Sequence, residues 1–231
     1  MELQLRHAQD RGSSQHSWLS STHSFSFASY YDPRFIHFRS LRVLNDDTIA
    51  PHSGFPTHGH ENMEILTIVL QGSVTHSDSM GFSESISAGG CQLISAGSGI
   101  THSEMNHGDT PLRLLQIWIM PQQKNSLPRY SSIPPIQVPM NSWQCIASPN
   151  PTENVMPIYQ DATIMMGHFQ PQHSIEWPLS MGRAVYLHVI DGWVSMAGQL
   201  VTTGDAMMVS NMDCLNIMVL KQAHLLLFDL K

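Results

Sequence analysis

Two short stretches decide the fold of this chain: Phe55-Pro56-Thr57-His58-Gly59-His60-Glu61-Asn62-Met63-Glu64 and Gly99-Ile100-Thr101-His102-Ser103-Glu104-Met105-Asn106. Each places two potential metal ligands at positions i and i+2, namely His58 with His60 and His102 with Glu104. Side chains alternate between the two faces of a strand, so residues i and i+2 point the same way. Two adjacent strands of this kind predict three imidazoles and one carboxylate converging on a divalent transition metal, such as iron, nickel, copper or manganese. Such a set leaves coordination positions open for water or substrate, which indicates catalysis.

The residues between these stretches are typical of short strands joined by tight turns. The segment 64–70 is rich in branched apolar residues and precedes Gln71-Gly72, which indicates a strand that ends there. Further strands are predicted at 73–77, 91–95 and 114–120, and turns at 78–81, 89–90 and 96–99. Short strands at this spacing predict an antiparallel barrel or sandwich, and a small barrel can hold a ligand inside. Nearer the start, Leu41 to Leu44 predicts a strand and Asn45-Asp46-Asp47 its closing turn.

The two stretches resemble the paired motifs of the cupin family. The first motif, His-x-His-x3-Glu followed by a Gly, is matched, with the last Gly one place late, by His58, His60, Glu64 and Gly72. The second motif, Gly-x2-His-x3-Asn, is matched by Gly99, His102 and Asn106. The finer text around Ser95–Glu104, with Phe25-Ser26-Phe27 and Leu41–Asp47 near the start, looks like the pirin branch. This resemblance covers most of the chain.

The resemblance implies a fold, a metal and an activity. The fold would be all-β, a bicupin of two antiparallel jelly-roll barrels. The cofactor would be one divalent transition metal ion, iron first, with copper, nickel, manganese and zinc as alternatives. Bacterial pirin-like proteins are described as quercetin 2,3-dioxygenases, so the implied partners are a flavonol and O2. In such enzymes the substrate binds through its 3-hydroxyl, O2 adds, and the central ring opens with loss of carbon monoxide.

Two carboxylates compete for the fourth ligand position. The general cupin pattern favours Glu64, whereas the pirin branch places its carboxylate two residues after the last histidine, which is Glu104 here. Strand parity does not separate them. We therefore expect the metal ligands His58, His60, His102 and Glu104. Glu104 is also the candidate catalytic base, and Glu64 would accept a hydrogen bond from a ligand histidine. His52, His76 and His107 are expected at the surface.

The second half of the chain weakly repeats the first. When Gly192 is aligned with Gly72, Pro178 and Ser180 fall where His58 and His60 stand, so the repeat lacks ligands. We expect an N-terminal metal-binding barrel at 1–120 and a ligand-free C-terminal barrel at 141–231. Between them, 121–140 contains five prolines and is the predicted linker.

Composition limits the other functions. A formal net charge of −7, from 11 basic and 18 acidic residues, disfavours nucleic acid as a direct partner. Nucleotide-binding glycine motifs and the G-x-S-x-G elbow are absent from the sequence. Three widely spaced cysteines imply no disulfide framework. Signal-peptide and membrane-spanning runs are also missing, so we expect a soluble, cytoplasmic monomer.

Two rival functions stay open. One is a non-enzymatic, iron-binding regulator of the pirin type, in which the metal biases a surface for a protein partner. The other is a sugar or keto-acid isomerase on the same fold. A substrate screen of the metal-loaded protein separates these functions from an oxygenase.

Overall fold

The computed structural model describes residues 2–135 and 138–231, and the described residues are almost entirely antiparallel β-structure. Their one helical segment is a 3-10 turn, η1 (Ala8–Asp10). The chain divides into two compact units. The N-terminal unit comprises Gly12–Ile136 and Asn150–Gln160, and the C-terminal unit comprises Met1–Arg11, Gln137–Pro149 and Asp161–Lys231. The predicted all-β class with two barrel-like units is therefore confirmed.

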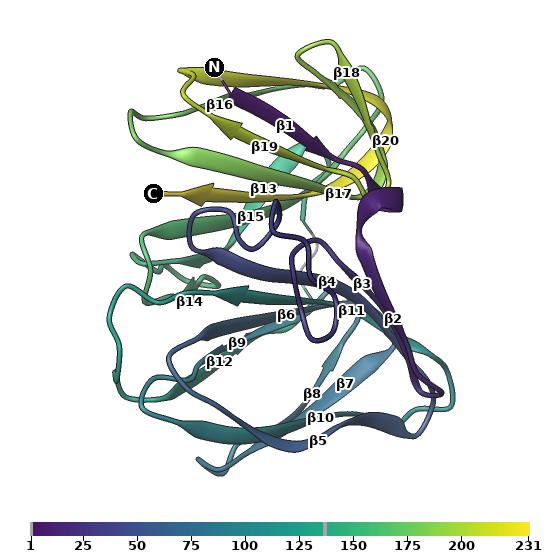
Figure 1. Cartoon of the computed structure of the whole chain (residues 1–231), viewed down its shortest axis with the longest axis vertical. Helices are drawn as coiled ribbons and strands as arrows, with labels where there is room; N and C mark the ends of the chain where they lie inside the picture. Colours follow the sequence, from purple (N-terminus) through teal and green to yellow (C-terminus); the bar gives the residue numbers. More distant parts are fainter. Residues whose placement is uncertain (1, 136–137) are drawn as a thin grey trace. The chain divides into compact units, whose positions relative to one another are not determined.

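Two antiparallel sheets form the N-terminal unit (Figure 1). The strands of the larger sheet are β2 (Gly12–Gln15), β3 (Leu19–His23), β4 (Leu41–Ile49), β6 (Glu64–Gln71), β9 (Cys91–Ser95), β11 (Leu112–Ile119) and β12 (Arg129–Ile133). Their order is β12-β9-β6-β11-β4-β3-β2. The smaller sheet has the order β5-β10-β7-β8, with β5 (Ser53–His60), β7 (Ser73–Asp78), β8 (Ser83–Ser87) and β10 (Ile100–Asn106). A two-residue strand, β14 (Met156–Pro157), lies in the later segment of this unit.

An apolar cluster joins the two sheets. Its buried members come from β3, β4, β6 and β11 on one side and from β7 and β8 on the other: Leu19, Ile49, Val69, Val74, Ile86, Leu112 and Leu114. Burying each such side chain contributes roughly 1.5–3 kcal/mol. The cluster thereby fixes β10 and β5 opposite the inner face of the larger sheet.

Strand β4 differs from its prediction. Asn45-Asp46-Asp47 was expected to form a turn, yet β4 continues through all three residues to Ile49. Each side chain has a partner on a neighbouring strand: Asn45 contacts His23, Asp46 pairs with Arg113, and Asp47 accepts a hydrogen bond from Ser21. These cross-strand contacts outweigh the turn preference of Asn and Asp.

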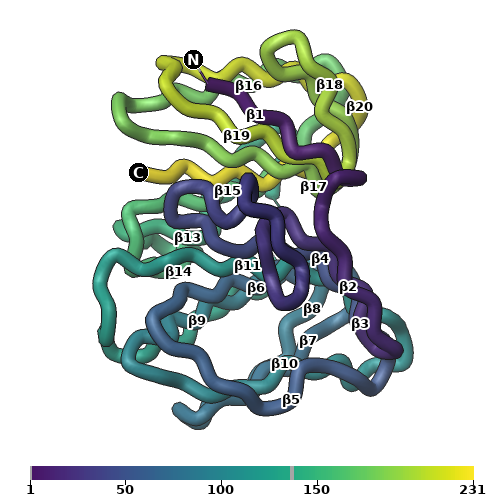
Figure 2. Tube along the Cα trace, viewed as in Figure 1, coloured from purple at the N-terminus to yellow at the C-terminus, as the bar shows by residue number. Residues whose placement is uncertain are grey.

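The C-terminal unit is built on two long strands. Its strands are β1 (Glu2–Arg6), β13 (Ser142–Ser148), β15 (Ala162–Phe169), β16 (Ser174–Pro178), β17 (Ala184–Met196), β18 (Gln199–Thr202), β19 (Ala206–Ser210) and β20 (Cys214–Leu230). The order runs β1-β19-β17-β20-β15-β13, with β16 on β20 and β18 on β17. Figure 2 shows the purple N-terminal strand lying beside β19.

The two units differ from the expected domains in three places, and the first is that residues 150–160 of the expected C-terminal barrel belong to the N-terminal unit. Residues 2–11 belong to the C-terminal unit, because β1 pairs with β19 from Glu2↔Ser210 to Arg6↔Ala206. The expected linker at 121–140 contains β12, which pairs with β9. Met1, Ile136 and Gln137 of the predicted segments lie outside the described residues. Within the described part of the chain, no helix has the length and apolar character needed to cross a membrane.

Candidate metal centre

Strands β5 and β10 carry the predicted histidines on one face. The strands pair antiparallel with His58 directly opposite His102. On β5, Thr57 and Gly59 are exposed while His58 and His60 are half-buried, so the period-two alternation turns both imidazoles inward. On β10, the buried positions include His102 and Glu104. The i, i+2 interpretation of both stretches is thus what the local backbone shows.

The three imidazoles converge. Each of His58, His60 and His102 offers a ring nitrogen, and these atoms lie within 4.8 Å of one another. The ring centroids are 4.5 to 5.0 Å apart. Among the described residues, this is the one group of three or more His, Cys, Asp or Glu side chains arranged so closely. Three imidazoles at this separation suit a divalent transition metal.

Hydrogen bonding prepares His58 to bind a metal and leaves His102 without a partner. His58 Nδ1 lies 2.8 Å from the carbonyl oxygen of Pro56, which can only accept, so Nδ1 carries the hydrogen and Nε2 keeps its lone pair. His102 is only 1% exposed, and neither of its ring nitrogens has a hydrogen-bond partner among the described residues. A buried polar group without a partner costs about 1–3 kcal/mol, and a metal ion at His102 would remove this cost.

The electrostatic environment keeps the rings of His60 and His102 neutral. Burial lowers the pKa of His60 to about 4, and the charge of His58 adds to the effect. Burial also lowers the pKa of His102 to about 3, with further contributions from His58, His60 and His76. Neutral imidazole is the metal-binding form, so His60 and His102 need to lose no proton at neutral pH.

His76 lies behind His102 and corrects the expectation of a surface histidine. Its side chain is fully buried, and its Nε2 is 2.8 Å from Asp78 Oδ2. The ring stacks on Tyr130 at 4.4 Å and lies 5.6 Å from the His102 ring. His76 therefore packs beside the His102 ring and supports its position. His52 and His107 are exposed, as expected.

Glu104 lies beside the three histidines and is held by three donors. Thr67 Oγ1 and Gln92 Nε2 donate to Oε1 at 2.8 and 2.7 Å, and Gln116 Nε2 donates to Oε2 at 2.7 Å. The carboxylate does not belong to the converging group of three rings. Oε2 accepts a single hydrogen bond from the residues that the structure describes, which leaves it capacity to bind an ion or to receive a proton.

Glu64 has a different role from the one expected. It opens β6, and its Oε2 accepts hydrogen bonds from Ser95 Oγ at 2.8 Å and from the Tyr159 backbone N–H at 3.3 Å. Burial raises its pKa. Among the described residues its hydrogen bonds come from these two groups and not from a histidine, so the expected contact with a ligand imidazole is wrong. Glu64 and Thr67 are three residues apart on β6, so their side chains point to opposite faces of the strand. Thr67 faces Glu104, and Glu64 therefore points away from it.

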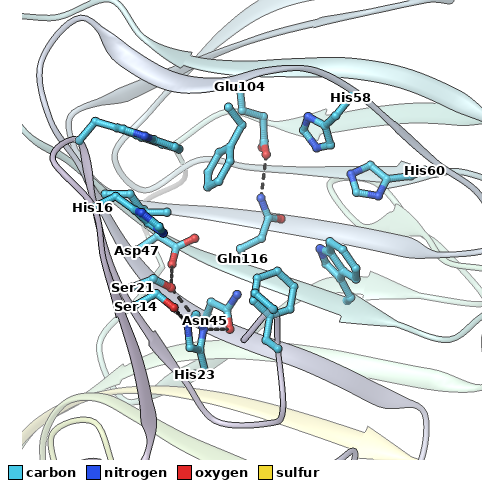
Figure 3. Close-up of a pocket in the computed structure, with 16 residues that line it drawn as sticks. Ser14, His16, Ser21, His23, Asn45, Asp47, His58, His60, Glu104 and Gln116 are labelled. Carbon is cyan, nitrogen blue, oxygen red and sulfur yellow. Dashed lines mark hydrogen bonds between the residues drawn. The ribbon is translucent and has the colours of Figure 1, made fainter. Parts of the chain in front are cut away.

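His58, His60 and Glu104 line a cavity of about 420 Å³ inside the N-terminal unit, and His102 lies buried behind them. The apolar, mainly aromatic part of the cavity wall is formed by Trp18, Leu19, Phe27, Phe55 and Trp118. Figure 3 shows His58, His60 and Glu104 at one end and Ser14, Ser21, His23, Asn45 and Asp47 at the other, with Gln116 between them. A volume in the range of about 300–1,000 Å³ and aromatic walls are typical of small-molecule sites.

Sequence reasoning missed a row of polar side chains on the larger sheet, three of which donate hydrogen bonds to Glu104. Cross-strand pairs place them in one row across five strands: Gln92, Thr67, Gln116, Asn45 and His23. A signal was present, because Thr67 and Gln116 are single polar residues inside otherwise apolar strands. A polar side chain at a buried strand position needs a partner, and here that partner is the carboxylate of Glu104.

A pair of matched substitutions tests the fourth ligand. Glu104→Gln is expected to weaken divalent-metal binding by more than the ~10–100-fold typical of changing an outer partner of a ligand, because the amide removes a negative charge beside the ion. Glu64→Gln makes the same chemical change at a buried site whose hydrogen bonds, among the described residues, come from Ser95 and Tyr159, so the metal affinity of this variant should stay near wild type. Competition with a chelator measures both constants. A larger loss in Glu64→Gln would return the ligand role to Glu64.

Comparison with known proteins places this geometry in context. A family model described as Pirin matches residues 4–119, and one described as the quercetinase C-terminal cupin domain matches residues 145–230. A protein named quercetin 2,3-dioxygenase from Escherichia coli K12 is 39% identical over 231 residues, which is 99% of this chain and 98% of the relative. A pirin-like protein from Caulobacter vibrioides is 36% identical and covers 94% of this chain and 95% of its own.

A solved structure is similar along nearly its whole length. The bacterial pirin YhhW from Escherichia coli, crystallised in complex with nickel(II), has a TM-score of 0.95 and 38% identity, and the match covers 99% of both chains. A quercetin 2,3-dioxygenase from Acinetobacter baumannii has a TM-score of 0.75 at 18% identity, covering 100% of this chain and 86% of that one, and shows the fold alone.

Proposed function

The chain belongs to the pirin family of the cupin superfamily, and from this we propose that it is a metal-dependent dioxygenase that opens the central ring of a flavonol such as quercetin. The observation that carries the proposal is the convergence of His58, His60 and His102, two of which line one end of an aromatic-walled cavity together with Glu104. Three relatives of comparable length bear the name quercetin 2,3-dioxygenase, one of them as putative.

We propose one divalent metal per chain, held by His58, His60, His102 and Glu104. Iron is our first candidate, and the nickel(II) complex of the related YhhW supports nickel as an alternative. A bound metal supplies Lewis-acid binding of the enolic oxygen of the substrate. The orphaned nitrogens of buried His102 support this donor set independently of the relatives.

The proposed reaction needs no reductant. Two carbon–carbon bonds of the central ring break, and the two atoms of O2 bond to the two carbons that flanked the lost one. The carbon that bore the 3-hydroxyl leaves with its own oxygen as carbon monoxide. The hydroxyl proton passes to Glu104 and then to the carboxylate product. Atoms and electrons therefore balance with the flavonol and O2 alone.

The chain's own residues prepare the substrate for this step. Trp118 packs edge-on against His60 at 5.1 Å, and Phe55 packs edge-on against Trp18 at 5.1 Å, so flat aromatic surfaces line the approach to the histidines. Such walls favour a planar aromatic ligand and exclude water from reactive species. Gln92, Thr67 and Gln116 fix the carboxylate of Glu104, which is the proposed base.

Incubation with quercetin in air tests the proposal. Protein loaded in turn with iron, copper, nickel and manganese is mixed with quercetin, and flavonol absorbance, O2 and carbon monoxide are followed. We expect at least one metal form to bleach the near-ultraviolet band and to release one carbon monoxide for each O2 consumed. Metal-free protein is the control. Inactivity of every fully loaded form would favour the iron-binding regulator instead.

A monomeric state and a cytoplasmic location stay predictions.

A further inference from the structure

One end of the cavity lies away from the proposed metal ligands His58 and His60 and has no part in the proposed reaction. It is nevertheless built from polar side chains. Five of them line it on β2, β3 and β4: Ser14, Ser21, His23, Asn45 and Asp47 (Figure 3). Four are paired in register across these strands, Asn45 with His23 and Asp47 with Ser21. A sheet face that otherwise buries apolar residues therefore carries a second polar cluster at a fixed place.

Most of this cluster is internally satisfied. His23 Nδ1 lies 2.9 Å from Asn45 Oδ1, which can only accept, so Nδ1 carries the hydrogen. His23 Nε2 is then the acceptor for the hydroxyl of Ser14 at 2.8 Å. These contacts fix the imidazole and make the floor of this end rigid.

Asp47 is the exception. Its side chain is 2% exposed and lines the cavity, and among the described residues its one hydrogen bond comes from Ser21. Its neighbour Asp46 points to the other face of β4 and pairs with Arg113, whereas no cation pairs with Asp47 in the described part of the chain. In Figure 3 the second carboxyl oxygen of Asp47 points into the cavity. A buried carboxyl group with an oxygen aimed into an empty space indicates a ligand.

The electrostatic environment agrees with this geometry. Burial raises the pKa of Asp47 to about 7, and the charges of Asp46 and Glu104 add to the effect, while the hydrogen bond from Ser21 opposes it. Ionised Asp47 therefore opposes folding at pH values above its unfolded pKa. A buried ionisable residue that lowers the stability of the folded state is typical of a functional site.

The spacing matches an elongated aromatic ligand. Gln116, which holds Glu104, lies on β11, next to β4. Neighbouring strands are about 4.8 Å apart, so Asp47 on β4 and the Glu104-facing Thr67 on β6 are separated by roughly 10 Å of sheet. A planar molecule of two or three rings covers this distance along the aromatic walls, with one polar group at each end.

We propose that Asp47 selects the substrate: its free carboxyl oxygen hydrogen-bonds a phenolic hydroxyl on the ring farthest from the histidines. The inference rests on the proposed function, because that function places the opposite end of a flavonol at the metal. The ionised carboxylate accepts this hydrogen bond as a charge-assisted one, which a neutral amide at the same position does not match. The ligand class is a polyphenol that carries hydroxyls on its outer rings.

Equilibrium binding tests the proposal without turnover. Quercetin and 3-hydroxyflavone share the 3-hydroxyl, but 3-hydroxyflavone lacks the hydroxyls of the outer rings. Dissociation constants for both are measured under nitrogen by quenching of tryptophan fluorescence, on nickel(II)-loaded wild type, Asp47→Asn and the control Asp46→Asn. A hydrogen bond to a charged group predicts that the preference of wild type for quercetin falls by about 10–100-fold in Asp47→Asn. In Asp46→Asn the preference should stay unchanged.

The outcomes are separable from those of the proposed function. An unchanged preference in Asp47→Asn, or wild type that binds the two flavonols equally, overturns the inference. Asp47→Asn should stay folded, because it removes a charge that opposes folding and keeps an acceptor for Ser21. Admission of O2 to wild type then tests turnover by itself. If wild type prefers quercetin to 3-hydroxyflavone through Asp47 but does not turn quercetin over, this inference stands and the dioxygenase function is rejected. If quercetin is turned over but the preference does not depend on Asp47, the dioxygenase function stands and this inference is rejected.

Discussion

His102→Ala is expected to remove nearly all bound divalent metal and, with it, all turnover of quercetin. His102 is the most buried of the three converging histidines, and neither ring nitrogen has another partner among the described residues. Loss of the ring therefore leaves an ion with two half-buried imidazoles and one carboxylate. Wild type should hold about one ion per chain, since binding needs a preformed set of deprotonated ligands.

Elemental analysis of purified protein, together with the quercetin assay, measures this effect. The fold should survive, because water can occupy a polar space of this size, and thermal melting of the metal-free forms checks it. His52→Ala is the matched control: His52 is exposed, contacts Asp109, and lies near the same strands. It should retain full metal and activity. Equal metal in His102→Ala, His58→Ala and wild type would show that these residues are not the ligands.

The histidine site could be predicted because it depends on local geometry. His58 and His60 on one strand, and His102 and Glu104 on another, share a face through the two-residue period alone. Their convergence then needs only that the two strands be neighbours, which β5 and β10 are. The motif spacing carried that information. For the same reason the strands 64–71 and 91–95 fall within one residue of their predicted bounds.

The far end of the cavity could not be predicted, because it depends on contacts between distant segments. Asn45-Asp46-Asp47 has strong turn preference, and only its partners Ser21, His23 and Arg113 make it a strand. The pairing of β1 with β19 joins residues 2–6 to residues 206–210 through backbone hydrogen bonds, which composition does not reveal. The misjudged turn is also where the second polar cluster lies. Local preference fails where a buried site requires polar residues.

Glu104→Gln, reloaded with metal to full occupancy, is expected to bind quercetin and yet turn it over about 10²–10⁴-fold more slowly, the range for loss of a general base. The carboxylate is fixed by donors from β6, β9 and β11, so it is aimed before substrate arrives. An amide at this position keeps the volume but cannot take a proton. Its NH2 group would face either Gln116 or the pair Gln92 and Thr67, so a neighbouring side-chain amide must turn to accept from it.

Three measurements separate proton transfer from metal binding in that variant. Elemental analysis checks that the variant and wild type hold equal amounts of metal. Anaerobic titration with quercetin gives the dissociation constant, and steady-state turnover under air gives kcat. The expected signature is a kcat that falls while the dissociation constant changes little, because the interaction lost is one made in the transition state. Glu64→Gln, the same change at a glutamate bonded to Ser95, should leave kcat unaltered. Wild-type kcat in fully metallated Glu104→Gln would remove Glu104 from proton transfer and leave it, at most, a ligand.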